Sequence, residues 1–347
     1  MFLMLKRKNQ NGYKPPFVLS FIEDNFVSLW KLRFSLIGTL AVIIGLSTLF
    51  FTFIMALAGV DLLLMPFLVI ILNIIQWLIA PYLIDAMYRV KEVTASENPA
   101  LHSMVDKLSK KSRIKTPRLM KAKMSIPNAF AYGSPIAGSR VAVTTGLLET
   151  LEVEEVEAVI GHELGHLKHR DVQVMMFVSI LPAIFYYIGY SMLLSSMFSR
   201  RDSRDSGGAV IIGLASILIY WILTIFTLYL SRIREYYADR HSAVIVEDGP
   251  RKLSEGLAKI VNSTNRVKQN SRNKSTGSSS FKALFISDPD RSEMDSAALA
   301  QLGRGMDDRK LVQDVLRRKV TTFNRIMEVF STHPNIVKRL RALQELD

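Results

Sequence analysis

The amino-acid sequence predicts a mainly α-helical membrane protein, with four transmembrane helices and a polar α+β part that the second helical hairpin splits in two. Hydrophobic residues occupy 49% of the 347 positions and concentrate in four long uncharged runs. Each run reaches the roughly 20 residues that a helix needs to cross the hydrocarbon core of a bilayer. The polar segments between the runs combine helical periodicity with short β-prone stretches, which predicts a small β element.

The first two runs, residues 34–60 and 62–84, are separated only by Asp61 and predict a tight helical hairpin, residues 34–85. Basic residues precede the first run, and the turn contains no Lys or Arg. The positive-inside rule therefore places both ends of the hairpin in the cytoplasm. The first run begins too far along the chain, after too polar a leader, to be a cleaved signal peptide. We expect residues 1–33 to be a cytoplasmic N-terminal tail.

The third and fourth runs, residues 172–198 and 209–230, predict a second hairpin, residues 172–230. For this pair a buried core helix stays open as the alternative, because tyrosines and serines make the pair less apolar. Three arginines in the connecting loop, residues 199–208, would also lie on the outer side, against the positive-inside rule. The sequence alone therefore leaves open whether these two segments cross fully.

Composition excludes several classes of site. The chain has no cysteine, which excludes a disulfide framework, a Cys-ligated zinc finger, an iron–sulfur site and a thiol nucleophile. The formal net charge of +13 suits either nucleic acid or the anionic face of a membrane. The apolar runs decide in favour of the membrane, and we expect membrane lipid rather than nucleic acid as a partner.

Two polar stretches, residues 86–171 and 231–347, remain between and after the hairpins. In the first, residues 129–132 and 140–144 are β-prone around a Gly-Pro turn and predict a small hairpin. From Val153 apolar residues recur every three or four positions, which predicts a helix. In the second stretch, residues 262–280 are rich in Ser, Asn and Lys and predict a mobile segment before further helices.

Residues 161–166 have the sequence Gly-His-Glu-Leu-Gly-His, which is the strongest indication of a metal-binding catalytic site. On a helix, His162 and His166 lie on one face about one turn apart and can bind the same metal ion. Glu163, beside the first histidine, is positioned to take a proton from a metal-activated water. Zinc suits this task because it tolerates three protein ligands with an open fourth position. The motif predicts one Zn²⁺ per chain in a hydrolytic site.

The third metal ligand must come from another segment. An extended motif with a third histidine at position 172 is ruled out, because Val172 stands there, and His169 is more typical of a structural role. Glu235 is the best candidate, and Asp239 shares its helical face four residues on. Asp239 can accept the outer N–H of a ligating imidazole. Since the histidines precede the third run and Glu235 follows the fourth, the second hairpin would bring them together close to the membrane.

With these motifs the chain resembles the HtpX-type membrane zinc metalloproteases and, more distantly, the CAAX prenyl endoproteases. The resemblance covers most of the chain from the first run onward. It depends on four motifs in the family's order, namely residues 127–131, 161–166, 234–240 and 331–334. It implies a zincin-like protease domain in two parts, residues 86–171 with the metal-binding helix and residues 231–347 with the third ligand and the C-terminal helices.

The resemblance also implies roles for individual residues. The implied zinc ligands are His162, His166 and Glu235, and Glu163 is the implied general base. An edge that aligns an extended substrate is implied for Asn128, Ala129, Phe130 and Ala131. His333 is implied to lie near the metal and to help hold the oxyanion during catalysis.

The function implied is that of a multi-pass endopeptidase of the plasma membrane whose protease domain faces the cytoplasm. Its expected substrates are misfolded or damaged membrane proteins. One alternative is a substrate-specific processing peptidase that resembles the prenyl endoproteases. Another is a non-enzymatic membrane scaffold or carrier with a structural metal. The absence of charge in residues 34–60 and 209–230 argues against a carrier.

Overall fold

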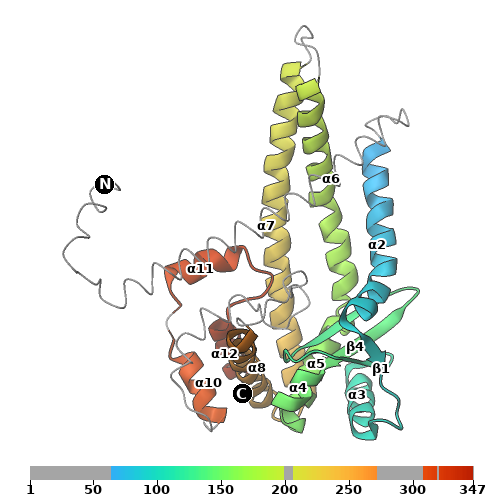
Figure 1. Cartoon of the computed structure of the whole chain (residues 1–347). Helices are drawn as coiled ribbons and strands as arrows, with labels where there is room; N and C mark the ends of the chain where they lie inside the picture. The colour runs from blue at the N-terminus through green and yellow to red at the C-terminus, as the bar shows by residue number, and fades with distance from the viewer. Residues whose placement is uncertain (1–63, 199–205, 272–307, 319, 347) are drawn as a thin grey trace, which may run out of the picture.

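The structure is a computed structural model that describes residues 64–198, 206–271, 308–318 and 320–346. The predicted N-terminal tail and the first predicted span, residues 34–60, lie outside the described residues. Within them the chain is mainly helical. Three long helices stand over a smaller part that contains a sheet and the shorter helices (Figure 1).

The three long helices are α2 (Met65–Tyr88), α6 (Asp171–Phe198) and α7 (Ser206–Ile245). Among the described residues, these three are long and apolar enough to cross a membrane. Their large apolar side chains point outward rather than into a core, which is the arrangement expected in lipid. The third and fourth predicted runs fall within α6 and α7, and the second run coincides with α2 from Met65 onward. The membrane class is therefore confirmed, and a count of four spans is not.

Glycines let α6 and α7 pack backbone to backbone. A Cβ atom placed on Gly189 would lie 3.0 Å from the carbonyl oxygen of Gly213, and one placed on Gly213 would lie 3.1 Å from that of Gly189. Small residues at such a crossing allow two membrane helices to approach closely. The second hairpin is therefore a tightly packed pair.

A four-stranded sheet lies at the base of α2, with strand order β1-β2-β4-β3. The strands are β1 (Val90–Glu92), β2 (Arg118–Ala122), β3 (Ala129–Ser134) and β4 (Gly138–Thr144). The predicted hairpin corresponds to β3 and β4, which pair antiparallel, whereas β2 runs parallel to β4. Because β3 is at an edge of the sheet, one side of its backbone has no strand partner among the described residues.

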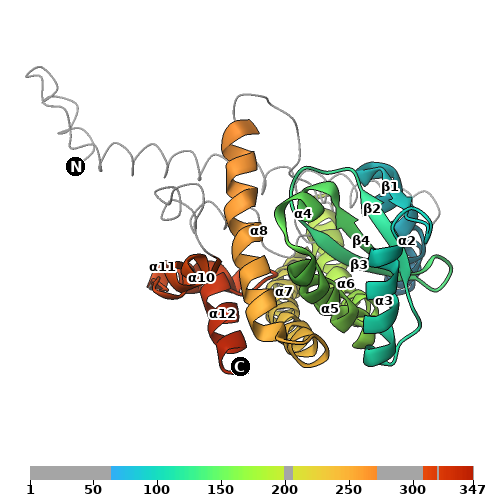
Figure 2. The same cartoon turned by 90° about the horizontal axis from the view of Figure 1, so that it is seen from below.

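Three helices lie against the sheet and form the core with it, namely α3 (Pro99–Ser112), α4 (Thr145–Thr150) and α5 (Val153–Lys168). Helix α8 (Gly249–Ser271) packs against α5, α7 and α4, away from the strands (Figure 2). A capping box between Glu152 and Glu155 begins α5 where the periodicity predicted a helix. Buried side chains from the sheet and these helices form one apolar cluster that includes Leu108, Val141, Ile160, Leu164, Leu253 and Leu257.

The C-terminal part contains α10 (Asp308–Leu316), α11 (Thr322–Val329) and α12 (Ile336–Gln344). These are the further helices that the sequence predicted. The sequence predicted a mobile segment at residues 262–280; residues 262–271 continue α8, and residues 272–280 lie outside the described residues. Helix α7 also differs from the expected boundary at residue 230, because it runs without a break to Ile245. Glu235 and Asp239 therefore lie on the direct continuation of a membrane helix.

Helices α5 and α7 touch on both sides of His162 because two glycines face α7. A Cβ atom on Gly161 would lie 2.9 Å from Ser242 Oγ, and one on Gly165 would lie 3.0 Å from Ala238 Cα. Even one methyl group at these positions would push the helices apart. The short distance between the helix carrying the two histidines and the helix carrying Glu235 thus depends on glycine.

We expect Gly165→Ala to lower the free energy of unfolding by about 1–3 kcal/mol, because the added methyl group overpacks the α5–α7 contact. The matched control is Gly256→Ala in α8, where the nearest atom to a new Cβ is 3.5 Å away. That substitution should be neutral or stabilise by about 0.5–1 kcal/mol, since alanine favours helices over glycine. Denaturant unfolding in detergent micelles measures both, and equal effects would contradict the packing argument.

Candidate metal centre

Two helices bring three potential metal ligands together. His162 and His166 come from α5 and Glu235 from α7, and one ligand atom of each lies within 4.8 Å of the others. The two histidine Nε2 atoms are 3.1 Å apart. Glu235 Oε2 is 3.7 Å from His162 Nε2, and Glu235 Oε1 is 3.5 Å from His166 Nε2. The side chains of His162 and Glu235 are buried.

These separations fit a tetrahedral cation. Metal–nitrogen and metal–oxygen bonds of about 2.0–2.1 Å at tetrahedral angles place two ligand atoms about 3.3–3.4 Å apart. The observed values of 3.1, 3.5 and 3.7 Å lie around that figure. Two imidazoles and a carboxylate are also a donor set that divalent zinc accepts. The arrangement can therefore hold one metal ion with a fourth position open.

Each of the two histidine rings has a carboxylate next to its Nδ1 atom. His162 Nδ1 lies 2.9 Å from Asp239 Oδ1, which is the contact expected from the sequence. His166 Nδ1 lies 2.6 Å from Asp171 Oδ2, a contact that the sequence did not predict. Such carboxylates orient an imidazole and direct its other nitrogen toward a metal. Asp171 reaches this place because Arg170 adopts a left-handed conformation, φ 55°, between α5 and α6.

A buried arginine from the last helix completes the site. Arg339 of α12 donates from Nε to Asp239 Oδ2 at 2.8 Å and from Nη2 to Asp239 Oδ1 at 2.6 Å. Its Nη1 also lies 3.3 Å from Glu235 Oε2. Only 1% of Arg339 is exposed, so one guanidinium balances two buried carboxylates without competition from water. The sequence analysis missed this residue.

Surrounding charges control the protonation of His166. Burial alone would lower its pKa, but the hydrogen bond to Asp171 and the charges of Glu235 and Glu163 outweigh that effect and raise the pKa to about 8. Without a metal the imidazole thus holds a proton at neutral pH. A bound metal ion must displace that proton.

Glu163 faces the free edge of the sheet. Its Oε2 atom accepts a hydrogen bond of 2.8 Å from the backbone N–H of Ala131 on β3. Asn128, in contrast, contacts β4, because its N–H donates to Thr144 Oγ1 and its carbonyl accepts from the Thr144 N–H. Phe130 is buried and its ring packs against Tyr132. The structure therefore brings the predicted edge and the predicted base side by side.

The two remaining histidines from the sequence analysis lie in different places. His333, in the link between α11 and α12, is buried and its Nδ1 lies 3.3 Å from Glu235 Oε1. His169 ends α5 and faces Tyr237 and His241, with ring centroids 5.9 and 6.0 Å away. His333 therefore contacts the candidate metal centre, whereas His169 is exposed and lies beside Tyr237 and His241 instead.

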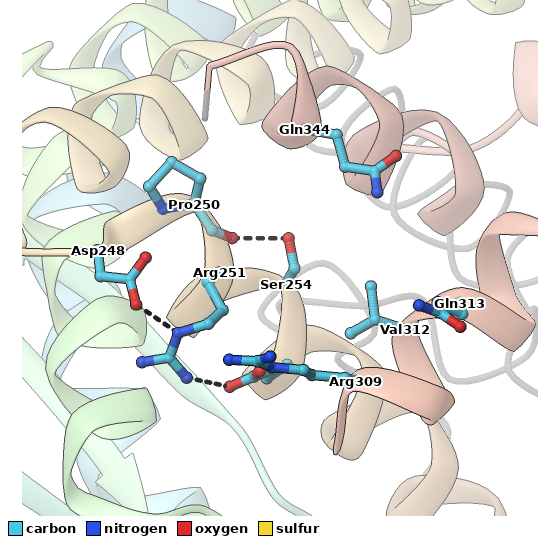
Figure 3. Close-up of a pocket in the computed structure, with 9 residues that line it drawn as sticks. Asp248, Pro250, Arg251, Ser254, Arg309, Val312, Gln313 and Gln344 are labelled. Carbon is cyan, nitrogen blue, oxygen red and sulfur yellow. Dashed lines mark hydrogen bonds and ion pairs between the residues drawn. The ribbon is translucent and has the colours of Figure 1, made fainter. Parts of the chain in front are cut away.

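A separate pocket of about 330 Å³ opens between α8, α10 and α12 (Figure 3). Three charged residues that line it form ion pairs with one another, because Arg251 contacts both Asp248 and Glu255. None of the residues predicted for the site lines this pocket. The candidate metal centre is thus a different place in the fold.

Comparison with known proteins agrees with this geometry. Curated relatives include a "Protease HtpX homolog" of Thermoplasma acidophilum, 40% identical over 80% of this chain and 83% of the relative. Another, of Aeropyrum pernix, is 35% identical over 90% of this chain and 95% of the relative. The crystal structure of S. mikatae Ste24p has a similar fold, with a TM-score of 0.51 at 15% identity over 91% of this chain and 67% of that one.

The family model described as "Peptidase family M48" matches residues 95–347, which include every side chain of the candidate metal centre. With the three membrane-spanning helices and the His-His-Glu group, this match settles the class of protein. The chain belongs to peptidase family M48 and is a membrane metalloprotease.

Proposed function

We propose that this metalloprotease uses one zinc ion, held by His162, His166 and Glu235, to cleave misfolded or damaged membrane proteins at the cytoplasmic face of the plasma membrane. The observation that carries the proposal is the set of distances between the proposed ligand atoms, 3.1–3.7 Å. These atoms lie on α5, which ends just before the span of α6, and on α7, which itself contains a span. Glu235 follows the apolar run of α7 by five residues, or about 7.5 Å along the helix. Peptide segments that leave the bilayer would meet the site first.

Glu163 is the proposed general base. Zinc, when bound, would polarise the scissile carbonyl and make an attacking water more acidic. The Glu163 carboxylate would accept the proton from that water and pass it to the leaving amine nitrogen. The N–H of Ala131 holds Oε2 in place, and this leaves Oε1 for the proton transfer.

The unpaired side of β3 is the proposed substrate edge. An extended peptide added along Ala129 and Ala131 would extend the sheet and run past Glu163. Because the Ala131 N–H already donates to Glu163, the peptide would pair with the other backbone groups of this edge. Asn128 would fix the start of this strand through Thr144, and the buried ring of Phe130 would anchor it to the core. His333, beside Glu235, would stabilise negative charge on the carbonyl oxygen during attack.

Asp239 and Arg339 are proposed to position the ligands. Asp239 would orient the imidazole of His162 so that Nε2 faces the metal. Arg339 would keep Asp239 and Glu235 charged and correctly aimed. Neither residue would touch the substrate.

The alternatives differ in what supports them. Membership of a peptidase family argues against a non-enzymatic scaffold. A processing peptidase stays open, because the fold is shared with Ste24p, although at 15% identity that likeness concerns the fold alone. The relatives at 35–40% identity are named HtpX homologues, and this favours broad proteolysis.

We expect Glu163→Gln to abolish proteolysis but to keep zinc, because the amide can still accept from Ala131 N–H yet cannot take a proton. His162→Ala should lose both, since a ligand is gone. Elemental analysis together with a proteolysis assay on the full-length protein in detergent measures both properties. Glu157→Gln, on the same helix and paired with Lys107, is the matched control and should keep both. Proteolysis by purified Glu163→Gln would remove the assigned base.

We expect Asp239→Asn to weaken zinc affinity by about 10–100-fold, because the imidazole of His162 loses a charged partner and Arg339 loses its bidentate one. Competition with a chelator measures the affinity. Asp106→Asn removes an exposed carboxylate on α3 and should change nothing. An unchanged affinity in Asp239→Asn would show that this carboxylate does not orient the ligand.

Breadth of cleavage separates the two peptidase functions. We expect the purified full-length protein to cut unfolded casein at many unrelated sequences, with no activity in Glu163→Gln. A prenylated CAAX peptide should be no better a substrate than its unmodified form. Cleavage confined to the prenylated peptide would instead favour a processing peptidase, while leaving the metal site as proposed.

A further inference from the structure

We propose that helix α11 lies in the membrane–water interface and that its outward face binds the lipid bilayer. Its apolar side chains face outward and a charged side chain faces inward, which is the reverse of a surface helix in water. Its exposed side carries Ile326, Val329 and Phe330, which are 55%, 37% and 58% exposed. Its inward side carries Glu328, which is 6% exposed. A surface helix in water buries its apolar stripe and exposes its charges, so this polarity requires an apolar partner outside.

Polar contacts on its inward side fix the rotation of α11 about its own axis. Glu328 Oε2 lies 2.6 Å from Lys338 Nζ, and its Oε1 accepts from the backbone N–H of Asn335 at 3.1 Å. Rotation of α11 to bury its apolar side would break these contacts. The exposed apolar face is therefore a fixed feature of the fold.

Arg232 fixes the depth of α11 relative to the membrane. Its Nη1 donates to the carbonyl oxygens of Glu328, Val329 and Ser331 at 2.8, 3.0 and 2.8 Å. Arg232 lies on α7 only two residues, about 3 Å, beyond the apolar run that ends at residue 230. The end of α11 is thus tied to α7 at the boundary of the hydrocarbon core. In Figure 1, α11 lies beside α7 and runs at a steep angle to it. Helix α11 would therefore lie roughly in the plane of a membrane that α7 crosses.

Large side chains are also exposed on the part of α7 next to Arg232. Phe226 and Tyr229, on the last turns of the apolar run, are 64% and 55% exposed. Tyr229 also lies against the Arg232 guanidinium, whose carbon is 5.8 Å from the ring centroid. Tyrosine at this depth is typical of a membrane interface. An exposed Arg325 on α11 is placed to meet lipid phosphates.

We therefore infer that the partner of this apolar face is a lipid bilayer with anionic headgroups. Short helices with an apolar face and basic residues bind in this plane, their apolar side chains about 5–10 Å below the headgroups. The chain leads from α11 directly to His333 and then to Arg339 on α12. Lipid contact at α11 would anchor this C-terminal segment over the candidate metal centre.

The absence of cysteine makes the depth of α11 directly measurable. We would prepare Phe330→Cys, label it with an environment-sensitive fluorophore, and reconstitute the full-length protein into phosphatidylethanolamine–phosphatidylglycerol vesicles. Nitroxide lipids report contact with the bilayer, and aqueous iodide reports contact with water. Phe226→Cys, within the span, is the lipid-exposed control. Val244→Cys, 76% exposed on the far end of α7, is the water-exposed control.

We expect the label at Phe330 to be quenched by nitroxide lipids near the headgroup, and several-fold less by iodide than the label at Val244. Quenching like that at Val244 would show a water-exposed face and overturn the proposal. Protection from both quenchers would show that protein covers the face, either another chain or a segment outside the described residues, and would also overturn it. Ile326→Cys repeats the measurement if the first variant fails to fold. None of these results depends on zinc or on proteolysis.

Discussion

The pairing of Arg339 with Asp239 and Glu235 is the interaction on which the candidate metal centre depends. Helix α7 brings two carboxylates into a buried place beside the histidines of α5, and without a cation their mutual repulsion and lost hydration would be costly. One guanidinium with contacts of 2.6, 2.8 and 3.3 Å offsets this cost before any metal binds. Asp239 contacts His162 Nδ1, and Glu235 is the proposed third ligand. The last helix thus prepares a site whose ligands all lie elsewhere in the chain.

A continuous α7 connects this site rigidly to the membrane. The same helix contains a membrane span, the Arg232 that caps α11, and Glu235 one turn later. Gly161 and Gly165 let α5 approach this helix at backbone distance, and Asp171, at the start of α6, ties His166 to the second hairpin. Few degrees of freedom remain between the bilayer and the ligands. The geometry therefore suits a protease that meets its substrates where they leave the lipid.

The sequence predicted the parts of the site that local rules determine. The spacing in α5 placed two histidines on one face, and the four-residue step from Glu235 to Asp239 placed two carboxylates on another. Asp171 and Arg339 were missed for different reasons. The position of Asp171 depends on the left-handed conformation of Arg170. Arg339 follows Asp239 by 100 residues in the chain, and the packing that brings them together is not encoded in a local sequence pattern. Strand β2 was not predicted for a similar reason, because its pairing with β4 is long-range.

X-ray absorption at the zinc edge of the purified full-length protein tests the central claim most directly, because it reads the ligands of the metal without reference to activity. The account predicts two imidazole nitrogens and oxygen donors at about 2.0–2.2 Å, with the imidazole signal reduced in His162→Ala. A first shell made of oxygen alone, or a spectrum that does not change in that variant, would contradict it.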